Sequence, residues 1–507
     1  MGMFWGGPWD GGDAAARVQD ADRRPIVTRR RATCILVDRN PRVPLAYSLD
    51  MDDQQSNPES DASPQRELSE AEAMPPESTG QLESPAPTLK KRVVSIDVLR
   101  GVAVLGILAM NIYAFAMPFQ AYTNPLLGGG QDRASMATWF FTHLAFDQKF
   151  MPVFSMLFGA GLVLMWQRAG ERPMGSLWFR RQFWLLVMGA LHGYFLWFGD
   201  ILANYAVLGM AIYPLRRATP RTLLMVGTLL LLLGMPISTV MGYHAADMAS
   251  TARSLEARQE AGKPMSDKGR KLVAQWQQMR PMMAPTEEDI ERNIEVHRGG
   301  YWQIVQHRAP MTLMMQTSGL FFIGIWRMGA LMLIGMALMK LGVFSAARSD
   351  VFYRRLAAIG YGVGLPVVVV SCFQLAENRW DALYMQQQGL HWNTVGGVLV
   401  ALGHVAIVML ICRHRRWPSL QARLEAVGRM ALSNYLLHSI VLTMVFYGYG
   451  LGLYGQVDRP LQLVFVAAMW ALQLWWSPLW LGRWRFGPAE WLWRSLTYRR
   501  RQPMRRV

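Results

Sequence analysis

The chain contains ten long apolar segments, and short charged turns separate most of them. A helix needs about 20 predominantly apolar residues to cross the hydrocarbon core of a bilayer. Segments of suitable length cover residues 96–118, 137–166, 181–199, 201–217, 221–243, 319–341, 355–376, 393–412, 428–449 and 461–481. The pattern therefore predicts an all-α polytopic membrane protein with about ten transmembrane helices.

Two long polar stretches lie outside these apolar segments, one before the first segment and one between two segments. Residues 1–89 are rich in Asp, Glu, Ser, Pro, Gln and Arg, and they lack the apolar surface that folding requires. We expect a disordered tail there, followed by a transmembrane domain over 92–498 and a basic tail over 499–507. The charge of the first tail turns acidic at Met51, which favours Met51 as the true start and residues 1–50 as an over-extended reading frame. The second stretch is a loop over 244–318.

The arginines and lysines gather in alternate turns between the apolar segments. Because cytoplasmic loops carry an excess of Lys and Arg, both tails are predicted to be cytoplasmic and the loop 244–318 external. Within that loop, Thr286 and Asp289 have the spacing of a capping box that starts a helix.

Composition changes this picture little. The net charge of +17 is explained by the basic turns, so we expect the lipid bilayer and not a nucleic acid as the partner. The three cysteines, Cys34, Cys372 and Cys412, have no metal-ligand spacing, so no metal site is implied. Arginine strongly outnumbers lysine, as in proteins of GC-rich bacteria, which favours a bacterial inner membrane. The sequence is compatible with an oligomer.

Polar residues on the first apolar segment indicate a functional site. At about 100° per residue, Asp97, Arg100 and Asn111 fall within an arc of about 60° on one helix face. Such groups are costly in lipid, so they usually face a protein interior or a wet cavity.

A histidine and an aspartate mark the third and fourth segments. His192 lies eleven residues after Arg181, or about 16 Å along a helix, near the middle of a bilayer. It is suited to be a general base, and it is equally suited to a hydrogen bond between helices. Asp200 is suited to orient His192 or a substrate hydroxyl, or to cap the next helix.

Further polar residues are candidates for lining a substrate cavity. His143, Asp147 and Lys149 on the second segment must pair, snorkel or face a cavity. Asn434 and His438 share a helix face, for a cavity or for bonds between helices. Gly159 and Gly161 are expected to permit close helix packing. No Ser-His-Asp order, zinc spacing or haem-ligand pattern is visible along the chain.

Five motifs together resemble those of the YeiB-like family of bacterial inner-membrane proteins, a domain of unknown function. The motifs span residues 92–498 in the family's order. They are Asp97-Val-Leu-Arg100-Gly101 with Asn111; Lys149-Phe150 with Phe154-Ser-Met-Leu-Phe-Gly159; Leu191-His192-Gly193 with Gly199-Asp200-Ile201-Leu202; Gly428-Arg-Met-Ala-Leu-Ser-Asn-Tyr435; and Gly487-Pro-Ala-Glu490-Trp-Leu-Trp-Arg494.

That family is similar to the transmembrane acyltransferases, which include heparan-α-glucosaminide N-acetyltransferase. The resemblance implies a bundle of about ten helices that moves an acyl group from cytoplasmic acyl-CoA to an external hydroxyl or amine of a glycan or envelope component. Asp97, Arg100, Arg181 and Asn111 would then bind the donor, and His192 with Asp200 would catalyse direct transfer or carry a transient acyl group. The family often has Gln at the position of His438, so His438 is a poor candidate for a catalyst.

Two other functions stay open. A transporter or flippase for a small polar or lipid-linked molecule would use Asp147 and Lys149 for gating or proton coupling. No inverted repeat and no matching pair of interrupted segments supports it in the sequence. A non-catalytic membrane partner is the third class, and it leaves the buried polar residues with packing roles alone.

Overall fold

Helices are the regular elements of this protein. The computed structural model describes residues 93–127 and 132–506, all within one structural unit, Gly80–Val507. In these residues the sole β pairing is an isolated bridge between Trp484 and Arg505. The expected all-α class is confirmed, while the predicted tail 1–89 and Met51 lie outside the described residues.

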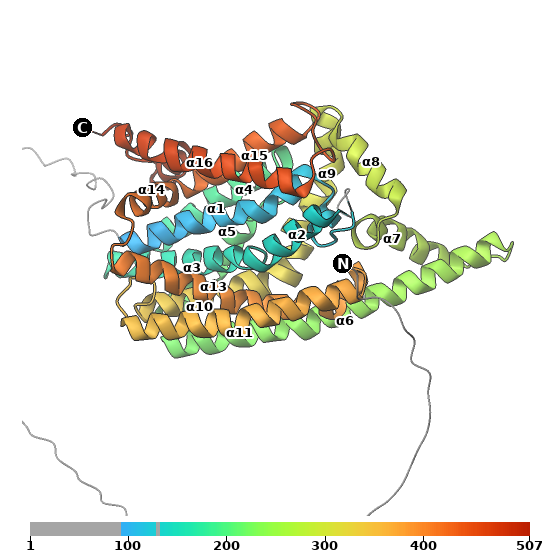
Figure 1. Cartoon of the computed structure of the whole chain (residues 1–507), viewed down its shortest axis with the longest axis horizontal. Helices are drawn as coiled ribbons and strands as arrows, with labels where there is room; N and C mark the ends of the chain where they lie inside the picture. Colours follow the sequence, from blue (N-terminus) through green and yellow to red (C-terminus); the bar gives the residue numbers. More distant parts are fainter. Residues whose placement is uncertain (1–92, 128–131, 507) are drawn as a thin grey trace, which may run out of the picture. The chain divides into compact units, whose positions relative to one another are not determined.

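The elements follow one another as shown in Figure 1. In chain order they are α1 (Val94–Ala116), η1 (Phe119–Tyr122), α2 (Arg133–Ala145), α3 (Phe150–Ala169), α4 (Gly175–Phe195), α5 (Leu202–Ala211), η2 (Tyr213–Arg217), α6 (Pro220–Glu260), α7 (Asp267–Met283), α8 (Glu287–His297), α9 (Tyr301–Gln316), η3 (Leu320–Gly329), α10 (Ala330–Lys340), α11 (Asp350–Glu377), α12 (Ala382–Tyr384), η4 (Met385–Gly389), α13 (Leu390–Arg413), α14 (Pro418–Arg429), α15 (Ala431–Phe446), α16 (Arg459–Arg483) and α17 (Pro488–Tyr498).

Seven helical segments in the described residues are long and apolar enough to cross a membrane, so the protein is a multi-pass membrane protein by length and composition. They are Val94–Ala116, Arg133–Ala169, Pro220–Glu260, Ile323–Lys340, Asp350–Glu377, Ala382–Arg413 and Arg459–Arg483. Helices α14 and α15 count as an eighth when taken together, although they are bent by 79°. Of the ten expected segments, 181–199 corresponds to α4, which is not among the seven, and 201–217 to the short helix α5 with η2.

The basic turns meet at one end of the bundle, which we call the basic end. Lys340, at the end of α10, donates to the carbonyl oxygens of Arg216 (2.8 Å) and Ala218 (2.7 Å), just before α6. Arg413, at the end of α13, donates to the Asp350 carboxylate at 2.7 Å, where α11 begins. The charged turns that the sequence groups on one side are therefore joined to each other in space.

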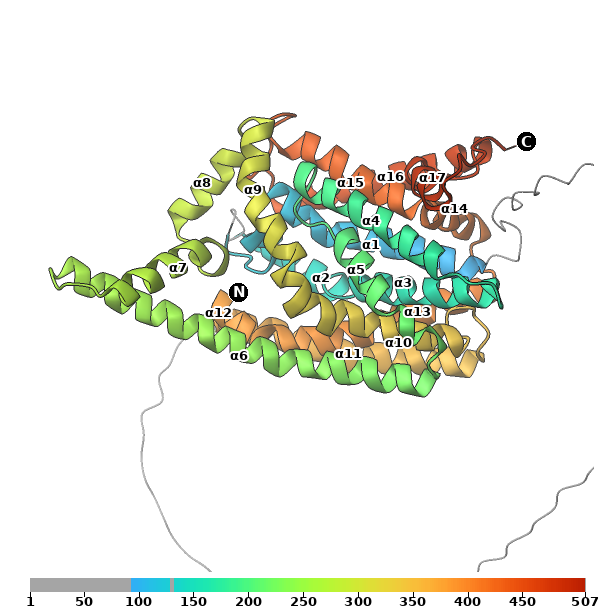
Figure 2. The ribbon, with the colours of Figure 1, turned by 180° about the vertical axis from the view of Figure 1, so that it is seen from behind.

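The predicted loop 244–318 is helical over most of its length, at the other end of the bundle. Helix α6 continues through 244–260, so its 41 residues extend over about 62 Å, twice the thickness of a hydrocarbon core. Thr286 and Asp289 form the expected capping box at the start of α8. Helix α9 then leads through η3 into α10, along α4 and α5 (Figure 2).

Glycines allow two helix pairs to approach until their backbones touch. A Cβ atom on Gly159 of α3 would lie 2.0 Å from the Met332 carbonyl oxygen of α10, and one on Gly335 would lie 2.0 Å from the Met156 oxygen. A Cβ atom on Gly428 of α14 would likewise lie 1.8 Å from the Asp97 carbonyl oxygen of α1. These contacts explain the motif glycines Gly159 and Gly428 by packing, as expected for small residues between membrane helices.

The two glycines of the third helix predict opposite outcomes on substitution. Gly159→Ala should destabilise the protein by about 1–3 kcal/mol, because the clashing atom belongs to the backbone of α10 and cannot rotate away as a side chain could. Gly161→Ala is the matched control and should not destabilise the protein. Its Cβ atom would meet nothing within 4 Å, and alanine favours the helix. Thermal denaturation in detergent, followed by the monodisperse fraction on size exclusion, measures both. Equal stability of the two variants would contradict the packing argument.

Candidate functional site

The tip of the α4–α5 hairpin holds Asp200 in a fixed position. The Asp200 Oδ2 atom accepts a hydrogen bond from the Ala203 amide in the first turn of α5, at 2.9 Å. Gly189 of α4 leaves room for this carboxylate, since a Cβ atom there would lie 2.8 Å from Oδ2. Both roles that the sequence offered for Asp200 are thus present together, because its other oxygen reaches His192.

His192 joins this carboxylate to a serine of a third helix. Its Nδ1 atom lies 2.9 Å from Asp200 Oδ1, and its Nε2 atom lies 2.8 Å from Ser439 Oγ of α15. All three residues are at most 4% exposed. We call Asp200, His192 and Ser439 the His192 triad.

The carboxylate determines where the proton of a neutral His192 sits. An ionised carboxylate accepts only, so Nδ1 must carry the hydrogen and Nε2 keeps the lone pair. Ser439 therefore donates its hydroxyl proton toward Nε2. This arrangement can remove a proton from a hydroxyl, which is the geometry of general-base chemistry.

Reading the chain for a linear Ser-His-Asp order missed this triad. The order here is His192, Asp200, Ser439, and 247 residues separate the histidine from the serine. Ser439 follows His438, which the sequence did single out, and it lies one turn after the motif residue Tyr435. The centre of the Tyr435 ring lies 5.1 Å from that of the His192 ring. The sequence signal that could have pointed to Ser439 is therefore its position one helical turn after this motif tyrosine.

Helix α9 covers the triad at the end of the hairpin. Arg308 donates to the carbonyl oxygens of Tyr194 (3.1 Å) and Leu196 (2.5 Å), and Thr312 donates to that of Gly193 (3.1 Å). The last carbonyls of a helix have no partner within it, and a cation there also matches the helix dipole. The segment that the sequence treated as a loop therefore closes one side of the site.

Asn111 of α1 faces the same hairpin. Phe115, one turn further on, stacks on Trp197 at 4.1 Å, which places Asn111 on the same face of α1. Among residues 103–117, Asn111 alone is partly exposed, and the other residues are buried. Its amide has no hydrogen-bond partner in the described residues, so it is available to a bound molecule.

A second polar cluster lies where the second membrane segment is interrupted. Helix α2 ends at Ala145 and α3 begins at Phe150, with Gln148 at a φ of 60° between them. The Asp147 carboxylate accepts from Tyr122 (2.9 Å) and from Asn393 of α13 (2.5 Å), and it lies 3.2 Å from His143 Nε2. We call this group the Asp147 cluster.

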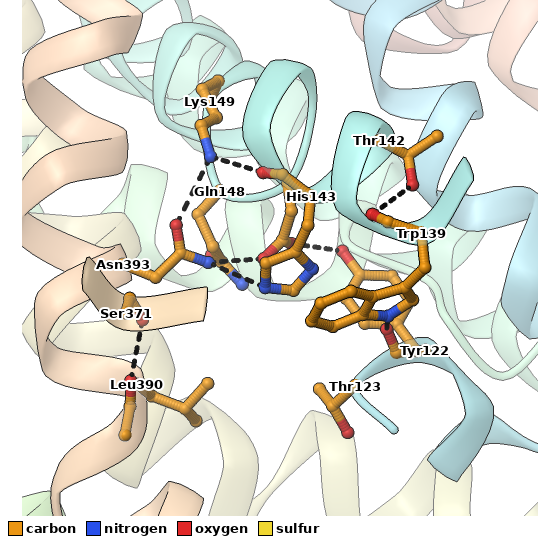
Figure 3. Close-up of polar contacts among 12 residues, drawn as sticks. Tyr122, Thr123, Trp139, Thr142, His143, Gln148, Lys149, Ser371, Leu390 and Asn393 are labelled. Carbon is orange, nitrogen blue, oxygen red and sulfur yellow. Dashed lines mark hydrogen bonds and ion pairs between the residues drawn. The ribbon is translucent and has the colours of Figure 1, made fainter. Parts of the chain in front are cut away.

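Cations outnumber anions in this cluster. Lys149 is fully buried and donates to the His143 carbonyl (2.7 Å) and to Asn393 Oδ1 (3.3 Å), as Figure 3 shows. Arg327 of η3 donates to Gln148. His143 is 1% exposed, and its Nδ1 atom has no hydrogen-bond partner in the described residues. Asp147 therefore offsets only one of two nearby positive charges.

The predicted donor-binding residues lie mostly at the basic end. Arg100 donates to Asp97 at 2.8 Å, within the first turns of α1. The Arg181 guanidinium lies 3.7 Å from the ring centre of Trp493 in α17, whose indole donates to the Arg181 carbonyl at 2.8 Å. Asn111 lies deeper on α1, about 21 Å beyond Asp97 at 1.5 Å per residue.

Asn434 and His438 are hydrogen-bonded across helices. Asn434 donates to Ser477 of α16 at 3.1 Å, and His438 Nε2 lies 3.0 Å from Gln473 Oε1 of the same helix. The structure thus separates His438 from the neighbouring Ser439, which faces His192. Bonds between α15 and α16 account for both residues without a substrate.

Glu490 of α17 holds the start of α15, immediately after the bend. Its Oε1 atom accepts from the backbone amides of Leu432 (2.7 Å) and Ser433 (3.1 Å). The sequence assigned this motif glutamate no such role, because its partners lie 57 and 58 residues away. Burial raises the pKa of Glu490.

Glu490→Ala should lower the free energy of unfolding by about 1–3 kcal/mol, because two amides of a helix start lose their acceptor. Glu425→Ala is the control: its oxygen lies 3.9 Å from Arg429 at a partly exposed site, and such pairs contribute about 1 kcal/mol or less. Thermal denaturation of both variants in the same detergent measures the difference. A smaller loss at Glu490 than at Glu425 contradicts the capping role.

These features define a class of protein: a multi-pass helical membrane protein with a buried Asp-His-Ser triad. Comparison with known proteins identifies the family. Residues 338–500 match the family described as "Protein of unknown function (DUF418)". The chain is 32% identical over 428 residues to "Uncharacterized protein YeiB" of Escherichia coli strain K12, an alignment that covers 82% of this chain and 98% of that protein.

Relatives also occur in Bacillus. "Uncharacterized protein YxaH" of Bacillus subtilis strain 168 is 30% identical over 431 residues, covering 82% of this chain and 97% of the relative. An "Uncharacterized 39.9 kDa protein in amylase 3'region" of Bacillus acidopullulyticus is 22% identical over 418 residues, covering 82% and 96%. The chain therefore belongs to the YeiB-like family, as its motifs predicted.

Proposed function

We propose that this protein is an acyltransferase of the bacterial inner membrane that uses cytoplasmic acyl-CoA and acylates a hydroxyl or amine on the other side. The observation that carries the proposal is the His192 triad, in which a buried histidine has one nitrogen held by a carboxylate and the other directed at a hydroxyl. Acyl transfer to a hydroxyl or an amine needs a base at that point.

The proposed topology has ten crossings, with both termini in the cytoplasm. It counts α4, α5 with η2, and the bent pair α14–α15 as crossings in addition to the seven long segments. The joined basic turns support this orientation, because cytoplasmic loops are enriched in Lys and Arg. The basic end then faces the cytoplasm, and α9 covers the triad from the outside.

The charges are suited to the two substrates. Acyl-CoA is strongly anionic, and Arg100 and Arg181 would meet it at the basic end. From Arg181 to His192 is about 16 Å along α4, so the thioester must extend into the bundle to react. Asn111 would contact the acyl group or the acceptor there. The acceptor would be a glycan or envelope component with a free hydroxyl or amine.

His192→Ala should lower acetyl transfer from acetyl-CoA to glucosamine or glucose at least about 10²-fold, since a general base contributes that much or more. The protein would be assayed in nanodiscs, with transfer followed by radiolabel. His404→Gln is the control, because His404 is a histidine of α13 that contacts Tyr361 and no member of the triad. Its transfer rate should match that of the unaltered protein.

Two results would overturn the acyltransferase. One is absence of acyl-CoA binding to the purified protein. The other is a His192→Ala variant that is as active as the unaltered protein, although size exclusion shows both to be folded.

The interrupted second segment favours one alternative, a transporter of a small polar or lipid-linked molecule. Transporters place binding and coupling sites at broken membrane helices, and the Asp147 cluster lies at such a break. π-helical segments are frequent at functional sites, and both Arg327 in η3 and the residues leading into α13 adopt one. Solute uptake into proteoliposomes that is lost in Asp147→Asn and Lys149→Met, but kept in His192→Ala, would select this function.

A further inference from the structure

Ser439 is placed to act as more than a hydrogen-bond partner. Its hydroxyl donates to the Nε2 lone pair of His192, because the ring hydrogen is on Nδ1, which Asp200 holds. A serine is a weak nucleophile at its ordinary pKa, and an adjacent base held by a third group is what activates it. We propose that Ser439 is the nucleophile of this protein and carries the acyl group as a serine ester. This inference rests on the proposed acyltransferase function.

The same hydrogen bonds make His192 a poor acyl carrier. Its Nδ1–H is engaged by Asp200, and its Nε2 lone pair is occupied by the Ser439 proton. Attack by Nε2 on a thioester would break the contact with Ser439 and leave a buried hydroxyl without its acceptor, which is unfavourable. Attack by Ser439 uses the existing contact, because the proton moves along it to Nε2.

The first half-reaction balances with the groups present. The Ser439 oxygen forms a bond to the thioester carbonyl carbon, and its proton passes to His192 Nε2. The carbon–sulfur bond then breaks, and the leaving thiolate takes the proton from His192, which releases free CoA. Asp200 stabilises the imidazolium between these two proton transfers.

The second half-reaction repeats these roles with the acceptor. His192 takes the proton of the acceptor hydroxyl or amine as its oxygen or nitrogen attacks the serine ester. The ester bond breaks, and Ser439 recovers its proton from His192. No oxidant, reductant or metal is needed in either half.

A covalent intermediate also suits the placement of Ser439 between the two ends of the bundle. It lies about 12 Å along α15 from Ala431, the first residue after the bend, while α9 covers the triad on the other side. With the acyl group stored on Ser439, the donor can leave at the basic end before the acceptor arrives. The site then never has to be open to both ends at once.

Isotope exchange tests the proposal without knowledge of the acceptor. A serine ester requires that labelled free CoA enters acetyl-CoA or palmitoyl-CoA when the purified protein is the only other component. The unaltered protein should catalyse this exchange, and Ser439→Ala and His192→Ala should each lower it at least about 10²-fold. Ser155→Ala is the matched control, because Ser155 is a fully buried serine of α3 that is hydrogen-bonded to Tyr205. This variant should catalyse CoA exchange at the rate of the unaltered protein.

The position of the acyl group gives a second, independent readout. After an acid quench, peptide mass spectrometry should find the acyl group on Ser439 of the unaltered protein. Ser439→Cys should carry it as a thioester that neutral hydroxylamine releases, whereas the serine ester resists. This variant and the adduct of the unaltered protein decide the question even if Ser439→Ala fails to fold on size exclusion.

The outcomes separate this inference from the function on which it rests. Transfer to an acceptor that persists in Ser439→Ala but is lost in His192→Ala overturns the serine ester and leaves the acyltransferase intact. An acyl group found on His192 does the same. Absence of both exchange and transfer in the unaltered protein overturns the function itself.

Discussion

Burying a polar side chain among membrane helices costs free energy unless a hydrogen-bond partner is at hand, and this constraint organises both polar clusters of the protein. Asp200 and His192 belong to one hairpin, but the second histidine nitrogen is satisfied by Ser439 of α15. Asp147 likewise depends on Asn393, 246 residues away. Because an unpaired buried group costs roughly 1–3 kcal/mol, each of these contacts also constrains how its helices pack.

Close backbone contact provides the framework on which those partners meet. Gly159 with Gly335, and Gly428 against Asp97, bring α3 to α10 and α14 to α1 with no side chain between them. Glu490 then holds the first amides of α15 after the 79° bend. Ser439 lies two turns beyond that capped start, so the cap at the basic end helps to determine where the serine meets His192.

The two polar clusters differ in a way that bears on function. In the His192 triad both carboxylate oxygens of Asp200, both ring nitrogens of His192 and the Ser439 hydroxyl have hydrogen-bond partners. These bonds lead a proton from Ser439 to His192. In the Asp147 cluster the one carboxylate interacts electrostatically with two cations, Lys149 and Arg327, and a buried histidine nitrogen is unpaired. The His192 triad therefore has all the groups that proton transfer needs. The Asp147 cluster instead has an excess of positive charge, which a bound anion or carbonyl oxygen would offset.

The sequence alone determined the helical class, the apolar segments, the basic turns, the capping box at Thr286 and the family, because periodicity, charge and motif spacing are local properties. It also selected His192 and Asp200, which are eight residues apart on one hairpin. Only the tertiary structure decided that Ser439 completes the triad, that α9 covers it, and that Gly159 packs while Gly161 does not. Those facts depend on which helix faces which, and helix pairing arises from contacts between residues far apart in the chain.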